Sequence, residues 1–368
     1  MIERLYIENF RTLVSLELRL RPLCLLLGEN GSGKTNIFDA LLSIQLFLSG
    51  DANVMGCFPP ANLTRWQKLN VQRFELEGTA GGVQYKYELA VEFDDQRRKA
   101  RVQKETLTSE GKPLFEFADG IVQLYRDDSS RGPAYPHDWT KSGLSSLYPR
   151  PDNTRLTAFK DEMARMVILK PCPVVMSDES RNEDEKLNER ASNFVSWYRY
   201  LLQSEAGLQT ELFERLREVF EGFDSFKLAG PPDSTKQMLL RFRLPEDAKP
   251  LPEYGFGELS DGQRMLILLY TLVYGTSAGR WILMIDEPDN YLSLREVQPW
   301  LTTLSDMLGT QFEQAVLISH HSEIINVMAD RQGLYLDRDK QGPTRVIEKP
   351  KWTDGLTPAE TVARGWVS

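Results

Sequence analysis

The sequence has few cysteines, no long hydrophobic run and no excess of positive charge. Its three cysteines, Cys24, Cys57 and Cys172, are too few and too scattered for a disulfide framework or a zinc set. The longest apolar runs, 265–273 and 281–285, are far shorter than the roughly 20 residues that span a bilayer. Charged residues near the N-terminus also argue against a signal peptide. We therefore expect a cytoplasmic protein without a membrane partner.

The formal net charge of -9 argues against a protein whose whole surface holds nucleic acid. One local basic run, "QRRKARVQK" at 96–104, leaves a nucleic-acid contact open. Such a run is more often a solvated face. Nucleic acid is therefore kept as an alternative partner.

The distribution of apolar residues predicts an α/β fold. Apolar strands such as "WILMIDE" and "AVLIS" alternate with helices in the last third, which indicates a mainly parallel sheet flanked by helices. The segments "RFELEG", "VQYKYELAVEFD" and "ARVQKETLTSEG" alternate in twos and predict an antiparallel meander. The alternation in "MIERLYIENFRTLVSLELRL" predicts two short strands joined as an N-terminal hairpin. The range 182–220 has helical spacing, with Gly207 between two helices, and shows no sustained heptad run.

We interpret the chain as three parts. Residues 1–48 and 236–368 would form two lobes of one nucleotide-binding body, because the motifs described next lie in them. Residues 49–235 would be an inserted lid with antiparallel strands and helices. This middle part carries no motif that points to a chemical role.

The stretch "GENGSGKT", Gly28 to Thr35, matches the phosphate-binding loop G-x-x-x-x-G-K-[ST] between a buried strand and a helix. Its glycines let successive backbone N–H groups point at phosphate oxygens, and the helix N-terminus adds positive potential. Lys34 would reach the β- and γ-phosphates, and the Thr35 hydroxyl would bind Mg²⁺. The predicted nucleotide ligands are Gly28, Glu29, Asn30, Gly31, Ser32, Gly33, Lys34, Thr35 and Asn36.

Two carboxylates end the buried strand of "WILMIDEP". A buried unpaired charge costs several kcal/mol, so acids at such a position are normally paired or lie at an open edge. Asp286 is suited to hold Mg²⁺, and Glu287 to polarise a water molecule that attacks the γ-phosphate. A strand ending in Asp-Glu can also simply cap the next loop. The phosphate-binding loop in the same chain favours the catalytic interpretation.

A second anion site is predicted at the start of "SDGQRMLILLYTLVYG". Ser260 is a helix N-cap residue, and its hydroxyl and the free amides beside it could bind an anion. An ordinary capped helix is the alternative interpretation. Nothing local explains why one chain would carry two anion sites.

These motifs resemble those of ABC-type ATPases. "LSDGQ" looks like their signature motif, "ILMIDEP" like their Walker B strand and "LISHHSEII" like their switch-histidine segment, in the family's order after the Walker A loop. The opening "YIENFRTL" is similar to the start of SMC-like and RecF-like members and of ABC-type AAA ATPases related to the OLD family. The resemblance covers the two ends of the chain.

The resemblance implies a homodimer that encloses two ATP molecules. Ser260, Gly262 and Gln263 would contact the γ-phosphate of ATP bound to the second copy. His320 would be the switch histidine, with His321 at the neighbouring position, and Arg11 would be the family's basic residue near the nucleotide.

Some features depart from the family pattern. Ser293 stands where the D-loop usually has aspartate, and Gln45, Gln67 and Gln72 all remain open as the Q-loop glutamine. Long arms and a zinc hook are absent. The sequence after His320 is too short for the TOPRIM nuclease of the OLD enzymes, so we expect a stand-alone ATPase.

The leading hypothesis is therefore an ATPase that converts ATP and water to ADP and phosphate with Mg²⁺. Its dimer would control a separate protein effector, a nuclease or toxin, in antiphage defence. One alternative is a RecF-like, ATP-gated DNA-binding protein in DNA repair. Another is an ATP-binding scaffold with negligible turnover. A transporter subunit is disfavoured by the N-terminal hairpin and the long insertion.

Overall fold

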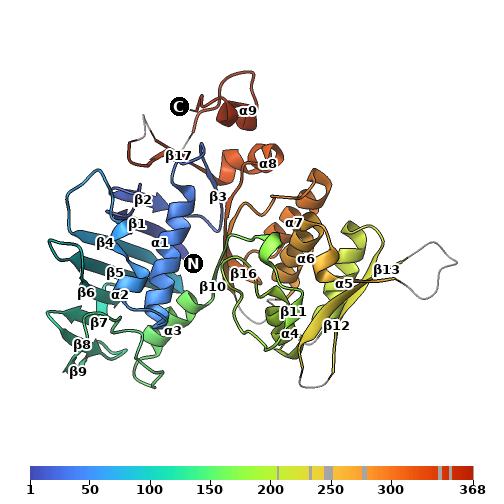
Figure 1. Cartoon of the computed structure of the whole chain (residues 1–368). Coiled ribbons are helices and arrows are strands. Elements are labelled where there is room, and N and C mark those ends of the chain that lie inside the picture. The colour runs from blue at the N-terminus through green and yellow to red at the C-terminus, as the bar shows by residue number, and fades with distance from the viewer. Residues whose placement is uncertain are drawn as a thin grey trace. The chain divides into compact units, whose positions relative to one another are not determined.

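The structure is a computed structural model that describes residues 1–204, 207–231, 234–243, 252–275, 280–338, 342–347 and 350–367. The chain divides into two compact units. The first contains 1–166 and 325–368, and the second contains 167–324. Figure 1 labels most of the helices and strands of both units.

An eight-stranded sheet forms most of the first unit. The strand order is β2-β1-β4-β5-β6-β7-β8-β9, and the strand pairs are antiparallel. The bounds are β1 (Ile2–Glu8), β2 (Leu16–Arg19), β4 (Val71–Ala80), β5 (Val83–Phe93), β6 (Ala100–Ser109), β7 (Lys112–Ala118), β8 (Ile121–Tyr125) and β9 (Arg131–Pro136). The predicted N-terminal hairpin and meander are both confirmed.

Helices cover the apolar face of this sheet: α1 (Lys34–Ser49), α2 (Val54–Cys57) and α3 (Thr154–Ala164). A chain of aromatic rings joins α1 to the strands. Phe47 packs on Phe58 at a centroid distance of 5.7 Å, Phe58 on Phe74 at 5.1 Å, and Phe74 on Phe10 at 5.9 Å. These four side chains are fully buried, so they anchor the helix that follows the phosphate-binding loop.

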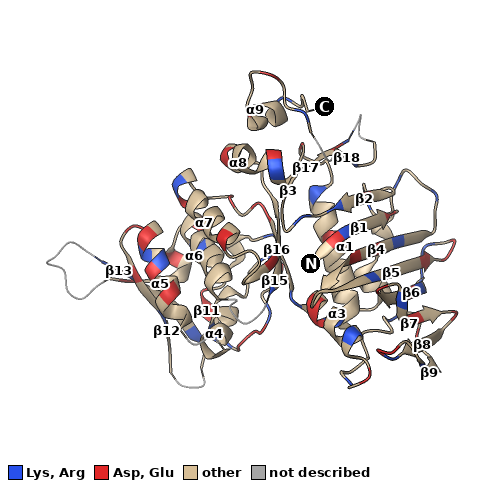
Figure 2. Cartoon of the chain, turned by 180° about the vertical axis from the view of Figure 1, so that it is seen from behind, with Lys and Arg blue, Asp and Glu red and all other residues tan. Residues whose placement is uncertain are grey.

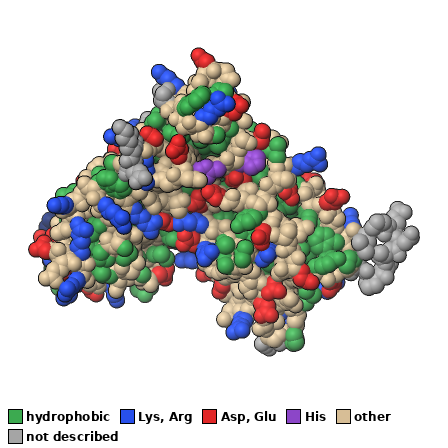
Figure 3. All heavy atoms as spheres, turned by 45° about the horizontal axis from the view of Figure 1, so that its top comes forward, with side chains coloured by type: hydrophobic (Ala, Val, Ile, Leu, Met, Phe, Trp, Pro, Cys, Tyr) green, Lys and Arg blue, Asp and Glu red, His purple; other side chains and the backbone are tan. Residues whose placement is uncertain are grey.

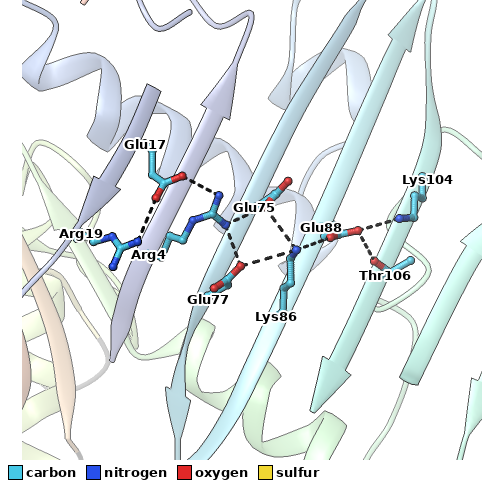
Figure 4. A network of polar contacts seen from close by, with 9 residues as sticks. All are labelled: Arg4, Glu17, Arg19, Glu75, Glu77, Lys86, Glu88, Lys104 and Thr106. Atoms are coloured by element: carbon cyan, nitrogen blue, oxygen red, sulfur yellow. Dashed lines mark hydrogen bonds and ion pairs between the residues drawn. The ribbon is translucent and has the colours of Figure 1, made fainter. Parts of the chain in front are cut away.

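The outward face of the sheet carries a charge network that crosses five strands. Arg4 on β1 donates to Glu75 and Glu77 on β4, each at 2.8 Å, and Lys86 on β5 pairs with Glu88 at 2.8 Å. Figure 4 shows the whole network, and Figure 2 shows basic and acidic residues interspersed on these strands. Because exposed pairs contribute little stability, the network mainly keeps this face polar and close to neutral.

Two positive charges of the basic run at 96–104 are also paired with acidic residues on this sheet. Lys104 lies 2.7 Å from Glu88, and Arg101 lies 2.6 Å from Glu92. These positive charges are thus compensated on the neighbouring strand. The run therefore offers less positive potential to a nucleic acid than its sequence indicates.

A second group of strands in the first unit joins the two ends of the chain. β3 (Leu23–Leu27) pairs in parallel with β17 (Gly333–Asp337), and β17 pairs with the antiparallel β18 (Arg345–Ile347). Four of the five residues of β3 are buried. The C-terminal part of the first unit also holds the end of α8 (Ser322–Gln332) and α9 (Pro358–Ala363).

The second unit begins in β10 (Met166–Leu169) and contains the parallel pair β15 (Trp281–Asp286) and β16 (Phe312–Ile318). Buried α6 (Asp261–Tyr274) packs against α7 (Leu294–Asp306) and α5 (Leu208–Val219). A smaller sheet consists of β11 (Glu179–Ser180), β12 (Phe223–Ala229), β13 (Lys236–Phe242) and β14 (Glu253–Gly255). α4 (Phe194–Ser204) precedes α5, and Gly207 stands between them.

The protein is thus mixed α/β, as the sequence predicts. Parallel pairs occur within each unit, whereas a mainly parallel sheet across the whole body stays a prediction. The three-part division of the sequence also stays a prediction. None of the helices in the described ranges has the length and apolar character needed to cross a membrane.

The predicted helix over 182–220 is wrong in its first part. Residues 182–193 are not helical, and the helix begins at Phe194. Asn193 accepts from the Asn188 N–H and donates to Lys186 O, and Asn188 accepts from the Ser192 N–H. The asparagine side chains thus form hydrogen bonds with nearby backbone groups, and these bonds take the place of the backbone hydrogen bonds of a helix.

Candidate nucleotide-binding site

The predicted phosphate-binding loop lies in the first unit, between β3 and α1. Gly28 has φ 142°, and a side chain there would come 2.1 Å from Leu336 O on β17. Gly33 has φ 103°, and a side chain there would come 2.4 Å from Thr344 Oγ1. Both positions thus require glycine, because the strand and the segment before β18 lie directly against the loop.

The loop has unsatisfied groups that suit an anion. Gly33 is the N-cap of α1 and gives its first turn no side-chain hydrogen bond. The Ser32 Oγ is buried, and among the described residues it has no hydrogen-bond partner. Uncapped amides, a buried hydroxyl and a helix N-terminus together fit a phosphate group.

Lys34 lies inside the loop. Its side chain is buried, with only 5% of the residue exposed, and its Nζ donates to Gly28 O at 2.8 Å and to Glu29 O at 3.0 Å. The ammonium group is therefore held where phosphate oxygens would replace the carbonyl oxygens. Thr35 is exposed at the start of α1.

Arg11 lies beside the first turns of α1. Its guanidinium forms an ion pair with Asp39 and donates to Asn36 Oδ1 at 3.2 Å and to Asn62 Oδ1 at 3.0 Å. Asn36 in turn donates to Thr12 Oγ1 at 2.8 Å. Arg11 thus links the N-terminal hairpin to α1, and its charge is balanced by Asp39.

The C-terminal segment encloses the other side of the loop. Arg338 Nη1 donates to Gly31 O at 2.7 Å, and Thr344 Oγ1 donates to Ser32 O at 2.8 Å. A side chain on Gly365 would come 2.6 Å from Glu29 Oε1. No local sequence motif points to these residues, because they reach the loop through the pairing of β17 with β3 and the contacts that follow it.

The Walker B segment lies in the second unit. β15 ends at Asp286, and Glu287 follows with φ 55°, a conformation that non-glycine residues rarely adopt. The His320 Nε2 lies 3.9 Å from Glu287 Oε1, and Asn290 Nδ2 donates to the other carboxylate oxygen. Both side chains are accessible, with exposed fractions of 37% for His320 and 40% for Glu287. Figure 3 shows histidine side chains at the surface beside acidic ones.

The two adjacent histidines have different surroundings. His321 Nδ1 accepts from the Glu323 N–H at 3.3 Å and so caps the start of α8. Its backbone N–H donates to Ser319 Oγ. His320 Nε2 thus lies near the Glu287 carboxylate, and the switch role given to His320 stays a prediction.

A buried acidic residue, Asp289, lies near the end of β16. Asp289 is only 8% exposed, and burial raises the pKa of its carboxyl. A hydrogen bond with Ser319 and the proximity of His321 partly offset this increase. Asp289 therefore links the loop after Glu287 to the histidine segment.

The signature segment begins α6. Ser260 Oγ accepts from the Gln263 N–H at 3.3 Å, and Gln263 Oε1 accepts from the Ser260 N–H at 3.0 Å. A side chain on Gly262 would come 2.5 Å from Tyr291 O. The signature turn and the loop after Glu287 are therefore in direct contact.

The three glutamines that could belong to a Q-loop have distinct environments. Gln45 donates to Met163 O and Met166 O, and Gln72 donates to Asn9 O and Asn62 O. Both hold the fold of the first unit together. Gln67 Oε1 is buried and lacks a partner within the described part of the chain.

The predicted residues thus form two groups. Arg11, the phosphate-binding loop and Asn36 lie together in the first unit, and Ser260, Gly262, Gln263, Asp286, Glu287 and His320 lie in the second. The local geometry of each group is compatible with the role given to it.

Comparisons with known proteins place this architecture in a class. The SmcHead bound to the C-winged helix domain of ScpA is similar to the chain, with a TM-score of 0.55 and 13% identity over 94% of this chain and 96% of that one. The SMC head domain from Thermotoga maritima is similar with a TM-score of 0.47 and 13% identity over 94% and 98%. The first of these likenesses shows that the chain has the fold of an SMC head.

The chain belongs to the family described as "AAA domain, putative AbiEii toxin, Type IV TA system", whose model matches residues 23–326. The match spans both the phosphate-binding loop and the histidine segment. No curated protein matches the chain significantly.

Proposed function

We propose that the protein binds and hydrolyses ATP and that two copies enclose two ATP molecules. The observation that carries the proposal is the pair of Glu287 and His320, with 3.9 Å between Oε1 and Nε2 at the end of a parallel strand. The uncapped loop around Lys34 supplies the matching phosphate site. Membership of an AAA-domain family supports the proposal that the chain binds a nucleotide.

In the proposed ground state, the loop amides and the N-terminus of α1 hold the phosphates. Lys34 exchanges its carbonyl partners, Gly28 O and Glu29 O, for phosphate oxygens. This exchange keeps the buried ammonium paired, since a buried charge without a partner is costly. Electrostatic stabilisation of charge that develops on the phosphate is the main contribution of such a site.

Mg²⁺ would be held by the Thr35 hydroxyl and the Asp286 carboxylate. The donor set fits, because Mg²⁺ prefers oxygen ligands and is usually bound by one or two carboxylates with water and phosphate. When bound, the ion neutralises negative charge on the phosphates.

Glu287 would orient the attacking water and accept its proton. The water oxygen forms a bond to the γ-phosphorus while the bond from that phosphorus to the ADP oxygen breaks. Asn290 holds one Glu287 oxygen, so the other is directed toward His320. The His320 side chain would donate to the γ-phosphate and detect its presence.

The signature would complete the site of the second copy. Ser260 uses an acceptor position to cap α6, which leaves its hydroxyl hydrogen for donation to a phosphate oxygen. Gly262 contacts Tyr291 O, so a movement of the signature would reach the loop after Glu287. We infer that this contact couples dimerisation to hydrolysis.

The proposed output is the control of a protein effector, a nuclease or toxin in antiphage defence. The family description names a putative toxin of a type IV toxin-antitoxin system, and the SmcHead was solved with the C-winged helix domain of ScpA. Both support a protein partner. The paired charges of Lys104 and Arg101 favour a protein over nucleic acid.

Phosphate release tests the enzymatic part. The wild type should release phosphate from Mg-ATP, and Glu287→Gln should lower the rate at least about 100-fold. Glu296→Gln is the matched control, because the Glu296 carboxylate accepts from Ser293 at the start of α7, and glutamine can accept there too. ATP binding without phosphate release by the wild type would instead identify a scaffold.

Expression of the chain alone tests the effector part. The proposal predicts normal growth without a partner, both for the wild type and for Lys34→Ala. Growth arrest by the wild type alone would show that the chain is itself the toxic component.

A further inference from the structure

An exposed tryptophan lies next to the phosphate-binding loop. The Arg338 guanidinium lies over the Trp66 ring at 5.4 Å from its centroid, and Arg338 Nη1 donates to Gly31 O. Trp66 is 42% exposed although it is a large apolar residue. Neither residue belongs to the sequence motifs described above.

Arg338 holds a fixed position relative to the loop. Besides the bond to Gly31 O, its Nε donates to Gly342 O at 2.8 Å. A planar guanidinium with two such bonds presents its face to the indole in a defined orientation. Arg338 thereby connects Trp66 to the phosphate-binding loop.

The segment that carries Trp66 also borders the other side of the loop. Asn62, four positions earlier, accepts from Arg11 Nε and from the Arg11 N–H through its backbone carbonyl. Arg11 contacts Asn36, which directly follows Thr35. The segment from Asn62 to Trp66 therefore lies beside the start of α1 and beside Gly31.

The chemistry of this surface fits a nucleobase. An indole face stacks well on a planar heterocycle, and one stacked base on an aromatic side chain contributes a sizeable, base-tolerant share of binding. Arg338 lies over one face of the Trp66 ring, and the residue is 42% exposed, so a planar base has surface of this side chain to stack on.

We propose that Trp66 is the stacking surface for the base of the nucleotide whose phosphates occupy the loop Gly28 to Thr35. This inference rests on the proposed function, since it needs a nucleotide in the loop. It adds a base contact that the phosphate motif does not include. Because stacking is tolerant of base identity, the site should accept a guanine base nearly as well as adenine.

Comparison of ADP with pyrophosphate tests the inference, because both place a diphosphate in the loop and only ADP has a base. Binding is measured by calorimetry with Mg²⁺ on the wild type, Trp66→Ala, Trp66→Phe and Trp139→Ala. Trp139 is a matched control, since it is 48% exposed and has Arg101 over its ring at 5.4 Å. It follows β9, and its carbonyl accepts from Val102 on β6.

Trp66→Ala should weaken ADP binding about 10-fold or more and leave pyrophosphate binding unchanged. Trp66→Phe should retain most of the ADP affinity, and Trp139→Ala should change neither ligand. Equal loss for ADP and pyrophosphate in Trp66→Ala, or no loss at all, would overturn the inference.

The two proposals fail in different ways. A wild type that binds neither ADP nor pyrophosphate contradicts the nucleotide site itself. A wild type that binds both, with Trp66→Ala unchanged, contradicts only the stacking role. Should Trp66→Ala not fold, photolysis of the wild type with 8-azido-ADP decides, since label must then appear at or beside Trp66; label confined to other segments overturns the inference.

Discussion

His320 Nε2 lies 3.9 Å from Glu287 Oε1, and the other Glu287 oxygen accepts from Asn290. Asn290 thus holds one oxygen of the Glu287 carboxylate, and the His320 ring lies near the other. Glu287 itself has a positive φ, so the local backbone turns sharply after β15. Strain of this kind is common at functional sites.

Separate replacement of the two histidines should distinguish the proposed γ-phosphate sensor, His320, from the residue that caps α8, His321. His320→Ala should lower the rate of ATP hydrolysis by about 100-fold, a typical contribution of a residue that acts in proton transfer or charge stabilisation. His321→Asn should hydrolyse ATP at nearly the wild-type rate, because asparagine can also cap α8. Steady-state phosphate release measures both, and the reverse order of effects would assign the switch to His321.

A methyl group on Gly262 should disturb the loop after Glu287. The added carbon would lie 2.5 Å from Tyr291 O, so Gly262→Ala should lower the free energy of unfolding by about 1–3 kcal/mol. Gly257→Ala is the control, since its nearest neighbour is the Asp178 carboxylate at 3.2 Å, a side chain that can move. Urea unfolding compares the two variants. Equal stability would show that the contact is not tight in solution.

The C-terminal segment should contribute to the phosphate site. Thr344→Val removes a donor to Ser32 O and should weaken ADP binding about fivefold, the equivalent of about 1 kcal/mol for one hydrogen bond. Thr344→Ser keeps the hydroxyl and should bind as the wild type does. Calorimetric titration with ADP measures the difference, and equal affinities of all three proteins would contradict a supporting role.

The buried carboxyl of Glu105 should make stability depend on pH. Burial raises the pKa of Glu105 to about 7, although Ser142, Gly143 and Tyr87 all donate to it. The pKa of Glu105 is higher in the folded state than in the unfolded state. The stabilisation of the folded state by Glu105 is therefore fully present below about pH 4.5 and is lost as the pH rises to about 7. The loss is on the order of 3 kcal/mol.

Glu105→Gln should remove this dependence. We expect the stability difference between wild type and variant to shift in favour of the variant between pH 5 and pH 8 in urea titrations. Parallel curves over that interval would show that Glu105 does not titrate there.

The sequence predicts the elements that have strong local signals. The loop Gly28 to Thr35, the cap at Ser260 and the strand before Asp286 follow from motif, N-cap preference and apolar runs, and the structure has each element in place. The helical spacing over 182–220 predicts a helix that includes 182–193, but in those residues asparagine side chains bind the backbone instead.

Other features depend on tertiary contacts and have no local signal. Arg338 and Thr344 reach the loop because β17 pairs with β3, across most of the chain. The contact between Gly262 and Tyr291 O joins two loops on separate elements. Such approaches are visible only once the fold is known.

The mass of Glu287→Gln protein by light scattering, with and without Mg-ATP, tests the central claim most directly. The double variant Lys34→Ala/Glu287→Gln is the control, since it lacks the ammonium in the phosphate-binding loop. We predict that Mg-ATP doubles the mass of the single variant and leaves the control monomeric. An unchanged mass of the single variant with Mg-ATP would contradict the ATP-dependent dimer and the roles proposed for Ser260 and His320.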